Sequence, residues 1–118
     1  MRKKNEILDL SMDFAVRVVK LYKYLNNEKK EYIISKQLLR SGTSIGANIR
    51  EAVYACSKND FVYKMNISLK EASETEYWLE LLHKTDYLNE TQFVSLMSDC
   101  SCISRILTSI INTSKNNR

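Results

Sequence analysis

The chain contains no proline and only two glycines, Gly42 and Gly46, in 118 residues. Proline and glycine supply most of the tight turns that join short β-strands, so this chain lacks the turn residues that a many-stranded β architecture requires. A chain of this length is expected to form one domain and to bury roughly two thirds of its unfolded surface. We therefore expect residues 1–118 to form a single all-α domain.

Apolar residues recur at alternating steps of three and four, which places them on one face of a helix. This spacing predicts four helices, at about residues 6–26, 30–56, 58–84 and 89–112. Ser57 and Asp60 have the spacing of a helix N-terminal cap and mark the start of the third helix. Asn89 and Gln92 repeat that spacing before the fourth. Residues 113–118 lack periodicity and are expected to form a disordered tail.

The short links between these helices predict their topology. A connection of a few residues cannot recross a helix about 30 Å long, so sequence neighbours must run antiparallel. The expected fold is an up-and-down four-helix bundle. The first and third helices carry more apolar residues than one stripe needs, which indicates either a broad core face or a subunit interface.

The N-terminus and the apolar content bear on the cellular compartment. Lys3 and Lys4 resemble the basic start of a signal peptide, but Glu6, Asp9 and Asp13 interrupt the apolar region that should follow. No run of about eighteen consecutive apolar residues suggests a membrane span. We expect a soluble cytoplasmic protein that does not associate with membranes.

The cysteines predict neither a disulfide framework nor a metal site. Cys56, Cys100 and Cys102 are an odd number, which suits a reducing compartment. Cys100 and Cys102 are two residues apart on a predicted helix and point in different directions, and the sole histidine, His83, cannot complete a zinc ligand set. We expect no metal and no cofactor.

Residues 42–46, Gly-Thr-Ser-Ile-Gly, match the nucleophile elbow of α/β-hydrolases. That motif needs a preceding strand and a histidine placed after an acid, whereas this segment lies inside a helical pattern. The two glycines also lack the spacing of a phosphate-binding loop. We therefore expect no enzymatic activity and interpret Gly42 and Gly46 as residues that let two helices pack closely.

A row of polar residues follows the second predicted helix beside its apolar stripe. It consists of Gln37, Arg40, Ser44, Asn48 and Glu51, and the third helix offers Lys70, Glu71, Glu74 and Glu76 as possible partners. Such a row could form a ligand or catalytic site. The interpretation that we favour is a network of ion pairs and hydrogen bonds that fixes helix or subunit register.

The positive charge is concentrated in the first half of the chain. Residues 1–58 contain 12 basic and 6 acidic side chains, whereas residues 59–118 contain 6 and 8. This asymmetry suggests a surface for a polyanion, or basic helices that pack beside acidic ones. The candidates for nucleic-acid binding are Arg2, Lys3, Lys4, Arg17, Lys20, Lys23, Lys29, Lys30 and Lys36. Tyr24 and Tyr32 lie close enough in sequence to supply stacking.

Two stretches of the sequence resemble a known protein family. The first is QLLRSGTSIGANIREA at residues 37–52, and the second comprises SKNDF at residues 57–61 and SLKEASETEYWL at residues 68–79. Both are similar to the four-helix-bundle family named for the 23S rRNA intervening-sequence proteins of bacteria, and the resemblance spans about residues 6–112. Many members carry proline, alanine and glycine where this chain has Gly46, Arg50 and Ala52, which indicates a variant branch.

The resemblance implies a ring-like homopentamer without enzymatic activity or cofactor. It also implies a relationship to the accessory variability determinant of diversity-generating retroelements, a basic pentamer that works with a reverse transcriptase and nucleic acid. We therefore expect a non-enzymatic oligomeric binding protein or scaffold that associates with RNA or DNA through basic surfaces of helices one and two. The alternative is a protein-interaction scaffold with no nucleic-acid role.

Overall fold

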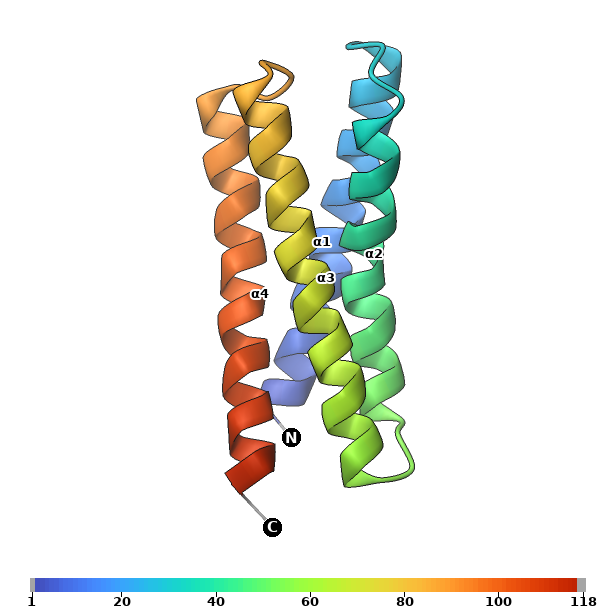
Figure 1. The fold of residues 1–118 in the computed structure, drawn as a ribbon, viewed down its shortest axis with the longest axis vertical. Coiled ribbons are helices and arrows are strands. Elements are labelled where there is room, and N and C mark those ends of the chain that lie inside the picture. The colour runs from blue at the N-terminus through green and yellow to red at the C-terminus, as the bar shows by residue number, and fades with distance from the viewer. Residues whose placement is uncertain (1, 117–118) are drawn as a thin grey trace.

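The computed structural model describes the backbone of residues 2–116 and the side chains of residues 6–116. Within this range the chain forms four helices, α1 (Arg2–Asn27), α2 (Ile34–Val53), α3 (Lys58–Lys84) and α4 (Glu90–Asn116). Figure 1 shows that each helix runs antiparallel to the next. This arrangement confirms the all-α, up-and-down four-helix bundle that the apolar spacing predicts.

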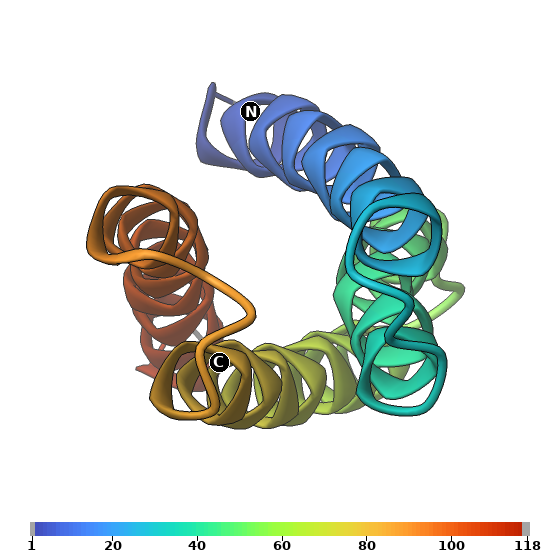
Figure 2. The same ribbon diagram turned by 90° about the horizontal axis from the view of Figure 1, so that it is seen from above.

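The helices surround a common core in chain order. Viewed along the bundle, α2 lies between α1 and α3, and α4 lies between α3 and α1 (Figure 2). The α1–α4 side is the least tightly packed of the four. Each helix contributes one buried apolar stripe, whose largest fully buried members include Phe14, Val18, Leu25, Leu38, Ile45, Ile49, Met65, Leu79, Leu82, Ile103 and Leu107.

Small polar residues join α2 and α3 within this core. The Ser68 hydroxyl donates a hydrogen bond to the backbone carbonyl of Ile45 at 2.8 Å. The Thr75 hydroxyl lies 2.9 Å from the Ser41 hydroxyl and 2.8 Å from the carbonyl oxygen of Glu71. Buried polar groups are costly unless they are paired, so these bonds fix the axial register of α2 against α3.

Helix α2 begins at Ile34, so the predicted start at residue 30 is wrong. Lys30 adopts a left-handed backbone conformation with φ of 56°, which a continuing helix cannot contain. The buried Glu31 carboxylate then accepts hydrogen bonds from the backbone N–H groups of Ile33, Ile34 and Ser35, at 3.0, 2.9 and 2.7 Å. This carboxylate satisfies the unpaired donors at the start of α2. The helix also ends earlier than predicted, at Val53 rather than at residue 56.

Helix α4 extends to Asn116, so the predicted disordered tail is wrong for residues 113–116. Ile110 and Ile111 are buried and hold the end of the helix against the core, and adding further turns to an existing helix costs little. Residues 117 and 118 lie outside the described residues. Helix α1 similarly begins at Arg2 rather than at residue 6.

Within the described residues, α4 is the one helix long and apolar enough, by length and composition, to cross a membrane. This is weak evidence, because a core helix of a bundle passes the same test. Six residues of α4 are buried in the bundle, among them Leu96, Ile103 and Leu107.

Candidate functional site

The two glycines lie where α2 approaches α1. A Cβ atom at Gly42 would lie 2.8 Å from Cγ2 of Val18, and one at Gly46 would lie 3.3 Å from the Ser11 hydroxyl oxygen. Only glycine allows the backbone of α2 to come this near to Val18. The glycines therefore take part in the close helix packing that their spacing indicates.

Ser44, the serine of the hydrolase-like motif, lies in the middle of α2 rather than on a strand-to-helix turn. Its hydroxyl donates to the carbonyl of Arg40 at 2.6 Å. The sole histidine, His83, is stacked on Phe93 with ring centroids 4.2 Å apart, and its Nε2 lies 3.0 Å from a carboxylate oxygen of Glu90. The segment thus lacks both the turn and the Ser–His contact that activates a serine nucleophile.

Arg40 is the centre of the polar contacts between α2 and α3. Its guanidinium lies 3.3 Å from a carboxylate oxygen of Glu71 and also donates to Glu74. The indole N–H of Trp78 donates to the same Glu74 oxygen at 2.9 Å. The hydrogen bonds from Arg40 and Trp78 lower the pKa of Glu74, and the bond to Glu74 raises the pKa of Arg40.

The rest of the polar row does not form one continuous network. Glu51 pairs with Lys64 at 2.8 Å, and this contact raises the pKa of Lys64. Asn48 donates to the carbonyl of Ser44 at 2.8 Å, within α2. Gln37 and Lys70 are exposed and make no hydrogen bond or ion pair to any residue between 6 and 116. Lys70 therefore makes no inter-helix contact among the described residues, and Lys64, six residues earlier, pairs with Glu51 instead. A contact of Lys70 between subunits stays a prediction.

Arg17 is the one nucleic-acid candidate that the described structure engages in an ion pair. Its guanidinium lies 2.7 Å from the carboxylate of Asp99 and donates to the hydroxyl of Ser95 at 3.0 Å. Both partners belong to α4, so Arg17 joins α1 to α4. Its charge is consequently less available to an external anion than the sequence suggests.

The other described candidates form a group that we call the lysine end. They are Lys20, Lys23, Lys29, Lys30 and Lys36, all exposed and all without an ion pair to a described residue. Lys20 and Lys23 lie on the last turns of α1, Lys29 and Lys30 in the connection, and Lys36 in the first turn of α2. Figure 1 places this connection at one end of the bundle. The side chains of Arg2, Lys3 and Lys4 lie outside the described residues.

Exposed aromatic and aliphatic side chains accompany these lysines. Tyr32 is 53% exposed and Ile33 is 79% exposed, both in the connection that carries Lys29 and Lys30. The neighbouring Glu31 carboxylate is buried against backbone N–H groups, so it does not oppose the lysine charges at the surface. The lysine end therefore offers free cations next to apolar surface.

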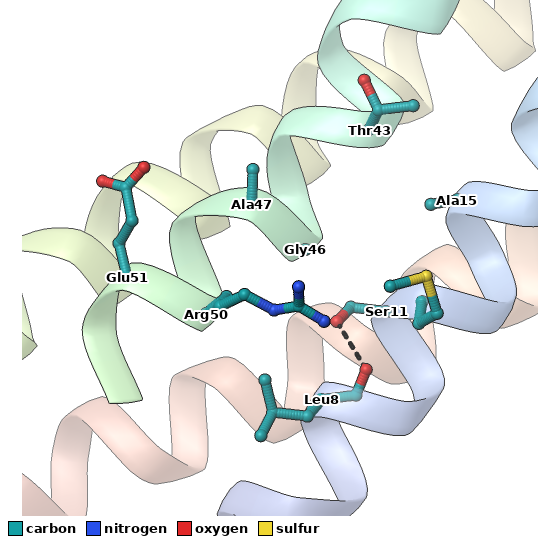
Figure 3. Close-up of a pocket in the computed structure, with 9 residues that line it drawn as sticks. Leu8, Ser11, Ala15, Thr43, Gly46, Ala47, Arg50 and Glu51 are labelled. Atoms are coloured by element: carbon teal, nitrogen blue, oxygen red, sulfur yellow. Dashed lines mark hydrogen bonds between the residues drawn. The ribbon is translucent and has the colours of Figure 1, made fainter. Parts of the chain in front are cut away.

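A second notable surface runs along α1 beside α2, and we call it the apolar face. It consists of Met12, Val16 and Val19 on α1 with Tyr54 just after α2, all at least 36% exposed. Beside it lies a groove of about 390 Å³ between the two helices, lined in part by Leu8, Ala15 and Ala47. Figure 3 shows the Arg50 guanidinium reaching across this groove toward Ser11. The surplus of apolar residues on α1 is thus partly surface rather than core.

The cysteines show no site geometry. The Cys100 thiol is buried and lies 3.5 Å from the carbonyl of Ala72, and burial raises its pKa to about 12, which leaves it protonated and unreactive at neutral pH. Cys56 is exposed and Cys102 is half-buried. Among the described residues, no three His, Cys, Asp or Glu side chains are grouped closely enough to hold a metal ion.

The comparisons with known proteins agree with this architecture. The family model described as 23S rRNA-intervening sequence protein matches residues 3–109. A crystal structure of a protein of unknown function from the S23 ribosomal protein family of Bacteroides thetaiotaomicron is 58% identical, with a TM-score of 0.93, and the match covers 93% of this chain and 98% of that one. No curated protein matches the sequence.

Neither comparison connects this chain with diversity-generating retroelements or with a reverse transcriptase. The relationship to the accessory variability determinant therefore stays a prediction. The family itself is established by a match over most of the chain. The chain belongs to the 23S rRNA-intervening sequence protein family.

Proposed function

We propose that this protein is a non-enzymatic, self-associating binding protein that attaches to RNA or DNA through the lysine end. The single observation that supports this proposal is a group of five exposed lysines that form no ion pair with any residue between 6 and 116, namely Lys20, Lys23, Lys29, Lys30 and Lys36. A lysine already paired with a carboxylate gains little from a phosphate, whereas an unpaired one can replace a counterion on the nucleic-acid backbone. These five lysines lie on the last turns of α1, in the connection and on the first turn of α2, at one end of a bundle about 49 Å long. Cations gathered in this way attract polyanions.

Self-association would strengthen this binding without new contacts. The apolar face exposes Met12, Val16, Val19 and Tyr54, and an exposed contiguous apolar surface marks a site of protein contact. Copies held together would present several lysine ends to one strand, and linked weak contacts bind far more tightly than single ones. The order of assembly that we propose is the homopentamer that the sequence resemblance implies.

Two double variants with the same change in charge test the proposal. Lys29→Gln/Lys30→Gln removes two cations from the lysine end, whereas Lys58→Gln/Lys70→Gln removes two exposed cations from α3. Affinity for a fluorescent RNA or DNA strand, measured by anisotropy at low salt, should fall about tenfold or more in the first variant and much less in the second. Equal losses in both would mean that only net charge matters and would refute a defined site.

A protein-interaction scaffold is the second candidate, and the apolar face favours it. In this case the exposed surface of α1 binds a protein partner and the lysines only keep the surface soluble. One measurement separates the two candidates. The scaffold hypothesis predicts that the wild-type protein does not bind nucleic acid at any salt concentration.

A further inference from the structure

A small groove lies between the C-terminal half of α1 and the N-terminal half of α4, next to the lysine end. It has a volume of about 260 Å³ and is lined by Arg17, Lys20, Leu21, Tyr24, Gln92 and Leu96. Leu21 and Leu96 are only 8% and 4% exposed, so the floor of the groove is apolar and belongs to the core. The groove therefore combines an apolar floor with polar and aromatic walls.

The polar wall on α4 is held in place by a helix cap. The backbone N–H of Gln92 donates to the Asn89 side-chain oxygen at 2.8 Å, and the Gln92 side-chain oxygen accepts from the backbone N–H of Asn89 at 2.9 Å. This reciprocal pair fixes which atom of the Gln92 amide is the acceptor. The Nε2 amide group is left with two N–H donors that no described residue engages.

The wall on α1 carries both charge and an aromatic ring. The Arg17 guanidinium forms a solvent-exposed ion pair with the carboxylate of Asp99, at 2.7 Å. Lys20, one turn further along, pairs with no carboxylate in the described part of the chain and supplies the free cation of the groove. Tyr24 follows by one more turn and is half-buried, with one part packed against the core and the rest accessible.

We propose that this groove receives one unstacked base of a single-stranded nucleic acid, with the adjoining phosphate on Lys20; this inference rests on the proposed function. A nucleobase has a flat face that stacks on tyrosine and ring and carbonyl acceptors that suit amide donors. A duplex keeps its bases stacked inside the helix, so it cannot place one against Tyr24. The groove therefore selects single strands, while the lysine end supplies affinity that is independent of base sequence.

Substitution of Tyr24 tests this inference. Tyr24→Leu removes the ring but keeps an apolar side chain, and Tyr24→Phe keeps the ring. Tyr63→Leu removes an exposed tyrosine on α3, away from both the groove and the lysine end. Affinity for a labelled single-stranded oligonucleotide should fall about 5- to 150-fold in Tyr24→Leu, as stacking energies predict. Tyr24→Phe and Tyr63→Leu should change this affinity less than about threefold. Circular dichroism would verify that each variant folds.

Lys20→Gln provides a second test at an exposed position where folding is not at risk. It should weaken binding and reduce the magnitude of the salt dependence by about one ion, whereas Lys58→Gln should do neither. If Tyr24→Leu and Lys20→Gln bind the single strand as tightly as the wild type, the inference about the groove is wrong. Equally tight binding of the wild type to a duplex would refute it too. Either result would leave the proposed function standing. Absence of any wild-type binding at low salt would overturn the proposed function itself. If Tyr24→Leu weakens binding to poly-glutamate as much as binding to the oligonucleotide, the groove does not recognise a nucleobase and the inference is refuted.

Discussion

Gly42 and Gly46 both face α1, but they leave different amounts of room for a side chain. At Gly42 an added methyl group would lie within 3 Å of two methyl carbons of Val18, which is fully buried and β-branched. At Gly46 the nearest atom is the Ser11 hydroxyl oxygen at 3.3 Å. The sequence spacing alone treats the two glycines as equivalent, and only the packed helices distinguish them.

Gly42→Ala is expected to lower the free energy of unfolding by about 1–2 kcal/mol, because overpacking outweighs the roughly 1 kcal/mol gain in helix propensity. The free energy of unfolding of Gly46→Ala should lie within about 0.5 kcal/mol of the wild-type value, because a smaller clash offsets the same gain in helix propensity. Urea unfolding followed by circular dichroism measures both values. A stabilised Gly42→Ala variant would contradict the close approach of Val18.

The pair formed by Arg40 and Glu74 makes stability depend on pH. The pKa of Glu74 is lower in the folded chain than its ordinary value of 4.5. The ionised carboxylate therefore contributes its full share to the free energy of unfolding above that ordinary value. This share is lost as the pH falls through the lower folded pKa. Between about pH 6 and about pH 3, the free energy of unfolding should therefore fall less steeply in Glu74→Gln than in the wild type. Glu80→Gln, an exposed change on the same helix, is the control and should follow the wild-type curve.

At the scale of helices, the apolar spacing predicts the existence and order of all four elements, because each must bury one stripe. The N-terminal cap of α3 was also predictable, since the Ser57 hydroxyl accepts from the backbone N–H of Asp60 at 3.1 Å. The sequence does not predict the start of α2, because the residue that caps it is Glu31, three residues before Ile34. Glutamate rarely caps helices. The apolar spacing does not predict the end of α4 either. It stops at the buried Ile110 and Ile111, and the residues that follow in the helix are polar.

The Glu31 cap has a measurable consequence. Glu31→Gln keeps the size of the side chain but removes the charge and one of the two acceptor oxygens, so it should destabilise the fold by about 1–2 kcal/mol. Glu28→Gln changes an exposed glutamate in the same connection and should alter stability by less than about 0.5 kcal/mol. Chemical denaturation of the two variants measures the difference. Equal stabilities would show that the three backbone hydrogen bonds to Glu31 contribute little.

For the whole molecule, the sequence predicts a basic surface but not which cations are free. Arg17 and Lys20 look equivalent in sequence, yet Asp99, 82 residues away, pairs with Arg17 alone. No local pattern signals a contact of that separation. Lys64 rather than Lys70 pairs with Glu51 because the short antiparallel connection places Glu51, near the end of α2, beside the first turns of α3.

Self-association through the apolar face can be tested at single positions. Val16→Glu places a charge on α1 at a side chain 46% exposed, and Val94→Glu places one on α4 at a side chain 53% exposed. Val16→Glu should lower the molar mass measured by light scattering at a given concentration, because burying an unpaired charge in an interface is costly. Val94→Glu should leave the mass unchanged. Loss of mass in the second variant alone would place the interface on α4 instead.

The most direct test of the account is the salt dependence of nucleic-acid binding by the wild-type protein. If four or five free lysines replace counterions, affinity for a single strand should fall about 50- to 130-fold between roughly 50 and 200 mM salt, with a linear log–log plot. This loss follows from the exposed and unpaired state of the lysine end. Undetectable binding at the lowest salt concentration, or an affinity that does not change with salt, would contradict it.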